Sequence, residues 1–301
     1  MRADRTERQE KRRRSAWLSE STSESRGALY NTILIDKKDR VTTLTLNRPE
    51  KRNAMSPELH AEMVQALTEL AHDDETAVLV ITGAGESFCA GQDLKKYFHE
   101  IRDTPAAREA ARKNSHDWRY RILNHFPKPT IAAVNGYCFG GAFTVVASCD
   151  IAIAADEATF GLSEINFGHI PGGMVAKIVA DAMIPRQALF YILTGRKFDG
   201  KTSRDIGFTT MSVPRANLMD TVYEIAEELK AKDPLALRAC KEAFKQVDLR
   251  RISHEEALSW LTAKSDQLIR KQSQRGGTDG IESFLKKEYR PGFGPAPQVN
   301  A

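Results

Sequence analysis

Short, almost wholly apolar runs recur along the chain and alternate with segments of mixed polarity. These runs lie at residues 77–82, 130–134 and 150–154. Continuous apolar runs of this length are typical of parallel strands whose sheet is covered on both faces. A turn follows each run, so the recurrence predicts an α/β fold that winds as a spiral of similar units.

The segment before these runs predicts a hairpin followed by a helix. Two stretches rich in β-forming residues, 32–36 and 41–46, enclose a short polar sequence. A polar loop then ends at Ser56, which predicts a helix cap with Pro57 in the first helical position. The apolar face of this helix would consist of residues spaced three or four apart: Leu59, Met63, Leu67 and Leu70.

The last third of the chain is more polar. Residues 234–247, 253–272 and 281–289 predict amphipathic helices outside the main sheet, and their apolar faces need a partner. A sequence rich in proline and glycine follows and predicts a loose tail. We therefore divide the chain into a leader, a core, a C-terminal helical region and a tail: residues 1–28, 29–220, 221–290 and 291–301.

Composition narrows the class of protein. The 301 residues are 41% hydrophobic, enough for a sizeable core, and no run approaches the roughly 20 apolar residues of a membrane helix. No metal-type spacing relates the four cysteines, and three of them lie in apolar sequence. Buried free thiols of this kind are typical of a reducing cytoplasm, and we expect no metal site.

The net charge of +4 is unevenly distributed. Residues 1–28 hold eight lysines and arginines in a context rich in serine and glutamate, which is typical of a disordered tail. No apolar stretch follows them, as a secretory signal would require. The alternatives for this leader are a solvated extension or a contact with nucleic acid or a partner protein. Only Trp17 accompanies the basic residues, so nucleic-acid binding ranks last.

Two features suggest enolate chemistry. Gly140 and Gly141 precede an apolar run that predicts a buried helix, so they would leave bare main-chain N–H groups at its positive end. Such a helix start suits an oxygen that acquires negative charge. Glu164 is the lone carboxylate of the mostly apolar segment 160–167 and could move protons beside it. The alternatives are that the glycines serve tight packing and that Glu164 is a surface residue.

Three motifs together resemble the crotonase (enoyl-CoA hydratase/isomerase) superfamily. They are LNRPEKRNA at residues 46–54, FCAGQDL at 88–94 and VNGYCFGG at 134–141. The resemblance covers about residues 30–290 in the expected order. It implies a crotonase-type ββα spiral core and a C-terminal helical region that builds homotrimers, often stacked as hexamers.

The resemblance also implies roles for the two glycine-rich loops. The main-chain N–H groups of Gln92 and Gly141 would form an oxyanion hole around a thioester carbonyl. The substrate would be a coenzyme A thioester, with no permanently bound cofactor. The implied coenzyme A site consists of residues from the first two motifs: Lys51, Ala54, Ala90, Asp93 and Leu94.

A narrower branch is similar at three places. Classical hydratases of this superfamily carry two catalytic glutamates; here Thr144 occupies the first position and only the second remains, as Glu164. Residues 93–98, 138–144 and 158–166 are similar to the hydroxycinnamoyl-CoA hydratase-lyases. These enzymes convert feruloyl- or coumaroyl-CoA into an aromatic aldehyde and acetyl-CoA.

For the acyl group, the resemblance implies that Tyr97 binds the 4-hydroxyl of the substrate. The implied substrate-binding residues are drawn from the same three places and their border: Tyr97, Thr144, Ser163 and Phe167. A second phenol-binding tyrosine of the branch is replaced by Trp260 or Thr262, and Phe167 stands where tryptophan is usual.

Because of these departures, the sequence does not determine the substituents of the ring. A second reading of the whole chain also stays open. That reading is an enoyl-CoA hydratase, isomerase or thioester hydrolase for another acyl-CoA. The alternatives for single residues are that Tyr97 is an amphipathic-helix residue with its tip in water and that Thr144 packs inside its helix.

Overall fold

A computed structural model describes residues 30–250 and 254–274, and the described residues from Thr32 onward belong to one compact unit. The predicted leader, the predicted helix at 281–289 and the predicted tail lie outside the described residues. None of the described helices is long and apolar enough to cross a membrane.

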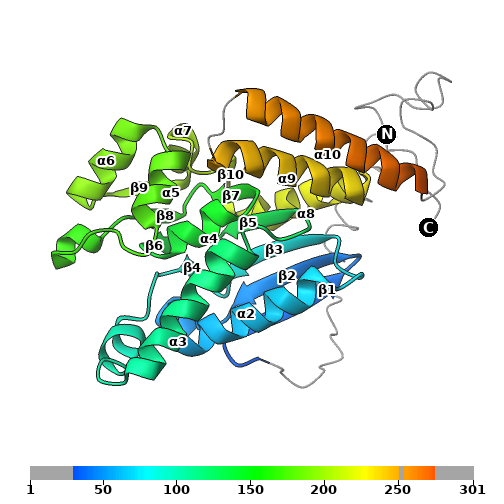
Figure 1. Cartoon of the computed structure of the whole chain (residues 1–301). Coiled ribbons are helices and arrows are strands. Elements are labelled where there is room, and N and C mark those ends of the chain that lie inside the picture. The colour runs from blue at the N-terminus through cyan, green and yellow to red at the C-terminus, as the bar shows by residue number, and fades with distance from the viewer. Residues whose placement is uncertain (1–29, 251–253, 275–301) are drawn as a thin grey trace, which may run out of the picture. The chain divides into compact units, whose positions relative to one another are not determined.

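The larger of two sheets has six strands in the order β1-β2-β3-β5-β7-β10 (Figure 1). The first pair is antiparallel and every later pair is parallel. All residues of β3 and β5 are buried, which confirms that the apolar runs are parallel strands covered on both faces. The strand bounds are β1 (Ile33–Lys38), β2 (Val41–Leu46), β3 (Val78–Gly83), β5 (Thr130–Val134), β7 (Ile151–Ala155) and β10 (Met211–Val213).

The smaller sheet explains the spiral. Its strands are β4 (Ser87–Cys89), β6 (Tyr137–Phe139), β8 (Thr159–Gly161) and β9 (Lys197–Asp199), in that order. Each of β3, β5 and β7 leads through a short turn into β4, β6 and β8 respectively, so the predicted recurrence is confirmed. A Cβ added at Gly136, in the second of these turns, would lie 1.8 Å from the carbonyl oxygen of Glu86. The turns therefore pass too closely for a side chain.

The predicted hairpin and first helix are confirmed. The β1–β2 turn consists of Asp39 and Arg40, both with positive φ (48° and 64°), as a two-residue hairpin with the native twist requires. Helix α2 (Pro57–Ala71) begins after Ser56, whose side chain accepts a hydrogen bond from the N–H of Leu59 at 3.2 Å. Its predicted apolar face is buried.

Further helical segments connect the strands. Helix α3 packs against α2 (Figure 1), and η2 and η3 are π-helical turns. Their bounds are η1 (Pro49–Lys51), η2 (Leu94–His99), α3 (Pro105–His116), η3 (Asp117–Ile122), α4 (Ala142–Ser148), η4 (Glu164–Phe167), α5 (Val175–Ala182), α6 (Pro185–Thr194), α7 (Gly200–Asp205), η5 (Arg215–Asn217) and α8 (Leu218–Lys230).

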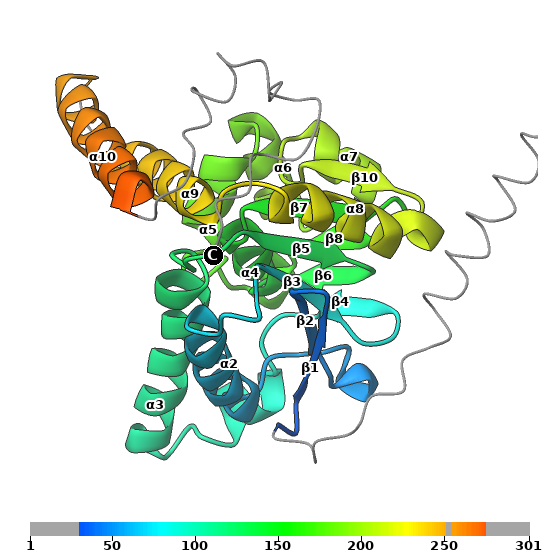
Figure 2. The same cartoon turned by 90° about the vertical axis from the view of Figure 1, so that its right-hand side faces the viewer.

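The last two described helices, α9 (Pro234–Arg250) and α10 (His254–Gln274), confirm two of the three predicted C-terminal helices. They lie side by side in both views (Figures 1 and 2). Lys241 and Lys245 of α9 bind the carboxylate of Asp150 at 2.6 and 3.1 Å, which ties α9 to the start of β7. Several large apolar side chains of this pair stay exposed in the single chain: Phe244, Leu258, Leu261 and Ile269.

Candidate active site

The two loops that carry the predicted N–H donors are in contact. Parallel pairing of β4 with β6 brings the end of one motif beside the end of the other. A Cβ added at Gly91 (φ +90°) would lie 2.8 Å from the carbonyl oxygen of Phe139 and 3.4 Å from the nitrogen of Gly141. A Cβ added at Gly141 would lie 3.7 Å from Cγ of Gln92. The structure thus brings the two predicted donor residues together, and only glycine fits between them.

Hydrogen bonds to the neighbouring carbonyls orient both donor peptides. The carbonyl of Gly91 accepts from the N–H of Met55 at 2.8 Å, and the carbonyl preceding Gly141 accepts from the N–H of Phe143 at 3.0 Å. In a trans peptide the N–H points opposite to its carbonyl, so the N–H groups of Gln92 and Gly141 point away from these partners. Within the described residues, neither N–H donates to a protein acceptor. Both are therefore available to a ligand.

Glu164 lies against Gly140, the residue before the predicted donor Gly141. It begins η4, and its Oε1 would be 3.0 Å from a Cβ added at Gly140, which has a φ of +51°. Its Oε2 is buried and has no hydrogen-bond partner within the described residues. Burial raises the pKa of this carboxyl group, since the charged form loses solvation there. A carboxyl group with an elevated pKa, held against the glycine that precedes a free N–H donor, is suited to proton transfer at an enolate.

Thr144 is buried directly beneath the loop. Its hydroxyl donates to the carbonyl of Gly141 at 2.7 Å and accepts from Nη1 of Arg119 at 2.8 Å. The side chain therefore takes part in fixing the start of α4. The sequence did not identify Arg119 as a residue of the site. Its position between two aromatic residues, Trp118 and Tyr120, was a signal that it is partly buried.

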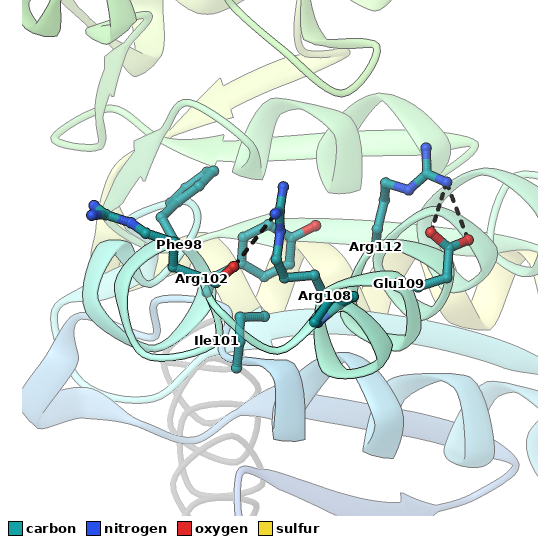
Figure 3. A pocket seen from close by; sticks show the side chains of 8 residues that line it. Phe98, Ile101, Arg102, Arg108, Glu109 and Arg112 are labelled. Carbon is teal, nitrogen blue, oxygen red and sulfur yellow. Dashed lines mark hydrogen bonds and ion pairs between the residues drawn. The ribbon is translucent and has the colours of Figure 1, made fainter.

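Tyr97 lies on η2, where its ring packs edge-on against His60 at 5.5 Å between ring centres. It also lines a cavity of about 630 Å³ between η2 and α3. Three of the residues that line this cavity are arginines (Figure 3), and one of them, Arg112, binds Glu109 at 3.0 Å. The other lining residues are Phe98, Ile101, Arg102, Pro105 and Arg108. The cavity shares Tyr97 with the predicted acyl site and carries a net positive charge.

Arg48 draws the predicted coenzyme A residues together. Its guanidinium donates to the carbonyl of Ala54 and to Oδ2 of Asp93, the latter at 2.9 Å. Asp93 also accepts from the N–H of Lys96 and so caps η2. Burial alone would raise the pKa of Asp93, but the hydrogen bonds from Lys96 and Arg48 outweigh it and lower that pKa. Asp93 thus has a structural task within the predicted site.

The remaining predicted residues differ in accessibility. The N–H of Ala90 donates to the carbonyl of Arg52 at 2.9 Å, which joins the first two motifs. Lys51 is exposed on η1, and Leu94 is 61% exposed at the start of η2. Solvent-facing cationic and apolar side chains on joined loops are available to a coenzyme.

Two predicted substrate residues flank Glu164. Ser163 is half-buried in the position before η4, whereas Phe167 is 65% exposed in the single chain. Trp260 lies on α10, half-buried, with Nζ of Lys264 at 5.8 Å from its ring centre. Thr262 is exposed on the same helix.

Comparison with known proteins agrees with the spiral of strands and the paired glycine-rich loops. The sequence profile of the enoyl-CoA hydratase/isomerase family matches residues 36–291. The chain belongs to the enoyl-CoA hydratase/isomerase family.

Comparison with individual members of the family shows which of them the chain resembles. The chain is 44% identical, over 91% of its length and 98% of the relative's, to a hydroxycinnamoyl-CoA hydratase-lyase of Pseudomonas fluorescens. It is 31% identical to the 2,3-dehydroadipyl-CoA hydratase of Escherichia coli, over 85% of this chain and 96% of that protein. A crystal structure of enoyl-CoA hydratase from Bacillus anthracis superimposes with a TM-score of 0.76 at 28% identity. That superposition covers 85% of this chain and 97% of the other.

Proposed function

We propose that this protein hydrates a hydroxycinnamoyl-CoA of the feruloyl or coumaroyl type and then cleaves the product to an aromatic aldehyde and acetyl-CoA. The observation that carries the proposal is the pair of unengaged N–H groups on Gln92 and Gly141, with the carboxyl group of Glu164 against the adjacent Gly140. The similarity to the Pseudomonas hydratase-lyase supports the choice of acyl group.

In the first step the thioester oxygen lies between the N–H groups of Gln92 and Gly141. Glu164 takes a proton from water as the water oxygen bonds to the β-carbon, and the electron pair of the double bond passes to the thioester oxygen. The resulting enolate is then protonated at the α-carbon by Glu164. A hydrogen-bond donor of this kind contributes about 3 kcal/mol to stabilising such an oxyanion.

In the second step the β-hydroxyl gives its proton to Glu164 and the bond between the α- and β-carbons breaks. The β-carbon leaves as the aldehyde, and the electron pair returns to the thioester as the enolate of acetyl-CoA. Glu164 returns the proton to the carbon of that enolate, which completes the reaction without an oxidant or a further reactant. Both steps create negative charge on the same oxygen, which explains why one oxyanion hole serves both.

Tyr97 is our choice for the group that binds the 4-hydroxyl of the ring. It lines the cavity between η2 and α3, and the arginines there favour a substituent with phenolate character. The proposed coenzyme A site consists of four residues: Lys51, Ala54, Ala90 and Leu94. Arg48 and Asp93 hold their loops in place.

A hydratase acting on another acyl-CoA is the second candidate, since the Escherichia coli relative is named as a hydratase. A two-carboxylate hydration is disfavoured here, because the first of the two positions is the buried Thr144. The deciding experiment incubates the protein with feruloyl-CoA, coumaroyl-CoA and crotonyl-CoA. We expect aldehyde and acetyl-CoA in equal amounts from the first two. Hydrated thioester without aldehyde would instead establish the second candidate.

We also propose a homotrimer, or a hexamer built from two trimers, in the cytoplasm. Exposed apolar side chains on η4, α6, α9 and α10 support an assembly in which a second copy covers them: Ile165, Phe167, Leu189, Phe190, Leu193, Phe244 and Leu258. The buried free thiols of Cys89, Cys138 and Cys149 fit a reducing compartment. Light scattering during size-exclusion chromatography would measure the number of protein copies in the assembly.

A further inference from the structure

A line of buried hydrogen bonds begins at the Gln92 side of the proposed oxyanion hole. Nε1 of Trp118 donates to Nδ1 of His60 at 2.8 Å, and Nε2 of His60 lies 2.8 Å from Oε1 of Gln92. Since Nδ1 accepts, the ring proton is on Nε2 and is donated to Gln92. Burial, together with the nearby charge of Arg119, lowers the pKa of His60 to about 3, so the ring is neutral at physiological pH.

The same line continues to the Gly141 side. Nε2 of Gln92 donates to Oγ of Ser115 at 3.2 Å, and Nη2 of Arg119 donates to the same oxygen. Nη1 of Arg119 then donates to Oγ1 of Thr144 at 2.8 Å and to the carbonyl oxygen of Gly141 at 3.2 Å. One connected network therefore holds the side chain of one proposed donor residue and the peptide carbonyl of the other.

Arg119 is the charged member of this network and is 2% exposed. Within the described residues no carboxylate forms an ion pair with it; it donates to the hydroxyls of Ser115 and Thr144 and to two main-chain carbonyls. Burial lowers the pKa of its guanidinium, but an arginine side chain in a protein remains protonated at physiological pH. A buried cation without a counter-charge is costly, so a negative charge that develops beside Gly141 would be stabilised by it.

We propose that Arg119 is a positioning residue for the oxyanion hole. Through Ser115 it holds Gln92, and through Thr144 and the Gly141 carbonyl it holds the start of α4. The two N–H donors are thereby kept at one fixed separation before the substrate arrives. This inference rests on the proposed function, because it assigns Arg119 to the same thioester site.

The proposal distinguishes transition-state stabilisation from substrate binding. Precisely aligned N–H donors stabilise the neutral thioester carbonyl only weakly. They stabilise the enolate much more strongly, because it carries a full charge at that oxygen. Loosening the network should therefore lower kcat more than it raises KM. If Arg119 served folding alone, a variant that still folds would show no difference between its effects on kcat and on KM.

The test uses the full-length protein and four variants: Arg119→Met, Arg119→Lys, Gln92→Leu and Arg121→Met. Gln92→Leu keeps the main-chain donor but removes the side-chain link to Ser115. Arg121→Met is the matched control, because Arg121 belongs to the same π-helical turn but is exposed and binds Asp117 instead. It removes the same charge without touching the network. Circular dichroism verifies the fold of each variant.

Two measurements are made on each variant. The first is kcat and KM for feruloyl-CoA. The second is the red shift in the absorption of bound cinnamoyl-CoA, measured in a Glu164→Gln background in which turnover is strongly slowed. That shift reports how strongly the carbonyl is polarised by the two N–H groups, and it does not require the cleavage reaction.

We expect Arg119→Met to lower kcat by about 10- to 100-fold, somewhat less than the loss of a whole oxyanion-hole donor, with KM within about threefold of wild type. The red shift should shrink in parallel, Arg119→Lys and Gln92→Leu should give intermediate losses, and Arg121→Met should match wild type. Combining Arg119→Lys with Gln92→Leu should cost less than the sum of the two, because one network is broken twice.

The proposal is overturned if a folded Arg119→Met variant keeps both kcat and the red shift. Should Arg119→Met fail to fold, Arg119→Lys and Gln92→Leu decide the matter, and an unchanged red shift in both would overturn it equally. A lack of aldehyde from every hydroxycinnamoyl-CoA would remove the proposed function. The cinnamoyl-CoA measurement would still test the network.

Discussion

Replacing Glu164 by glutamine is the sharpest test of the site, because it separates catalysis from stability. Glutamine has nearly the shape of glutamate, so the side chain can keep its place against Gly140. The variant loses the ability to accept and return a proton. Every proposed step that moves a proton between water and carbon depends on that ability.

The expected loss in kcat is about 10²- to 10⁴-fold, the usual contribution of one general acid–base group. At 1.36 kcal/mol for each factor of ten, this corresponds to roughly 2.7–5.4 kcal/mol of activation free energy. KM should change little, since the N–H groups of Gln92 and Gly141 remain. For the wild type, kcat/KM should fall on the acid side with a midpoint above 4.5, the ordinary pKa of glutamate, because burial raises the pKa of Glu164.

The thermal stability of the Glu164→Gln variant should rise at pH 7, although its kcat falls. The folded-state pKa of Glu164 is raised, so the unfolded chain loses this proton at lower pH than the folded chain does. The stability contributed by the protonated group is fully present below 4.5 and is lost as pH rises through the folded-state pKa. Glutamine stays neutral throughout. Glu164→Gln should therefore raise Tm at pH 7 and leave it unchanged at low pH.

The assay pairs product analysis by chromatography with thermal unfolding at several pH values. Glu224→Gln provides the control, since Glu224 is exposed on α8 and its replacement should alter neither quantity. Retention of wild-type turnover by Glu164→Gln would refute the assignment of the proton-transfer role. A drop in Tm at pH 7 would refute the reasoning about its burial.

Three further outcomes are expected. Tyr97→Phe should lower kcat/KM for feruloyl-CoA by roughly 10-fold, the value of one hydrogen bond of about 1.4 kcal/mol, while leaving that for cinnamoyl-CoA unchanged; steady-state kinetics with both thioesters would show it. Gly91→Ala should abolish turnover, because a Cβ would lie 3.4 Å from the nitrogen of Gly141 at a φ of +90°, and the same assay would show it. Asp150→Asn should lower the free energy of unfolding by roughly 1–3 kcal/mol in urea denaturation, since Lys241 loses its charged partner.

The sequence alone predicted the types of element and much of the chemistry. Apolar runs long enough to bury both faces had to become interior parallel strands, and Ser56 followed by Pro57 had to begin a helix. Adjacent glycines before an apolar helix indicated an anion site. Strands of three residues, such as β4 and β6, were not predicted, because so short a stretch carries no usable periodicity.

The tertiary structure alone decided how these parts meet. Pairing of β4 with β6 brings Gln92 to Gly141, and local hydrogen bonds at each loop orient the two N–H groups so that neither has a protein acceptor among the described residues. Whether Thr144 faces a substrate or the interior depends on Arg119, which reaches it from a separate segment. Such contacts depend on burial and on peptide orientation across distant segments. A single sequence records neither, because its patterns report only which residues lie near one another along the chain.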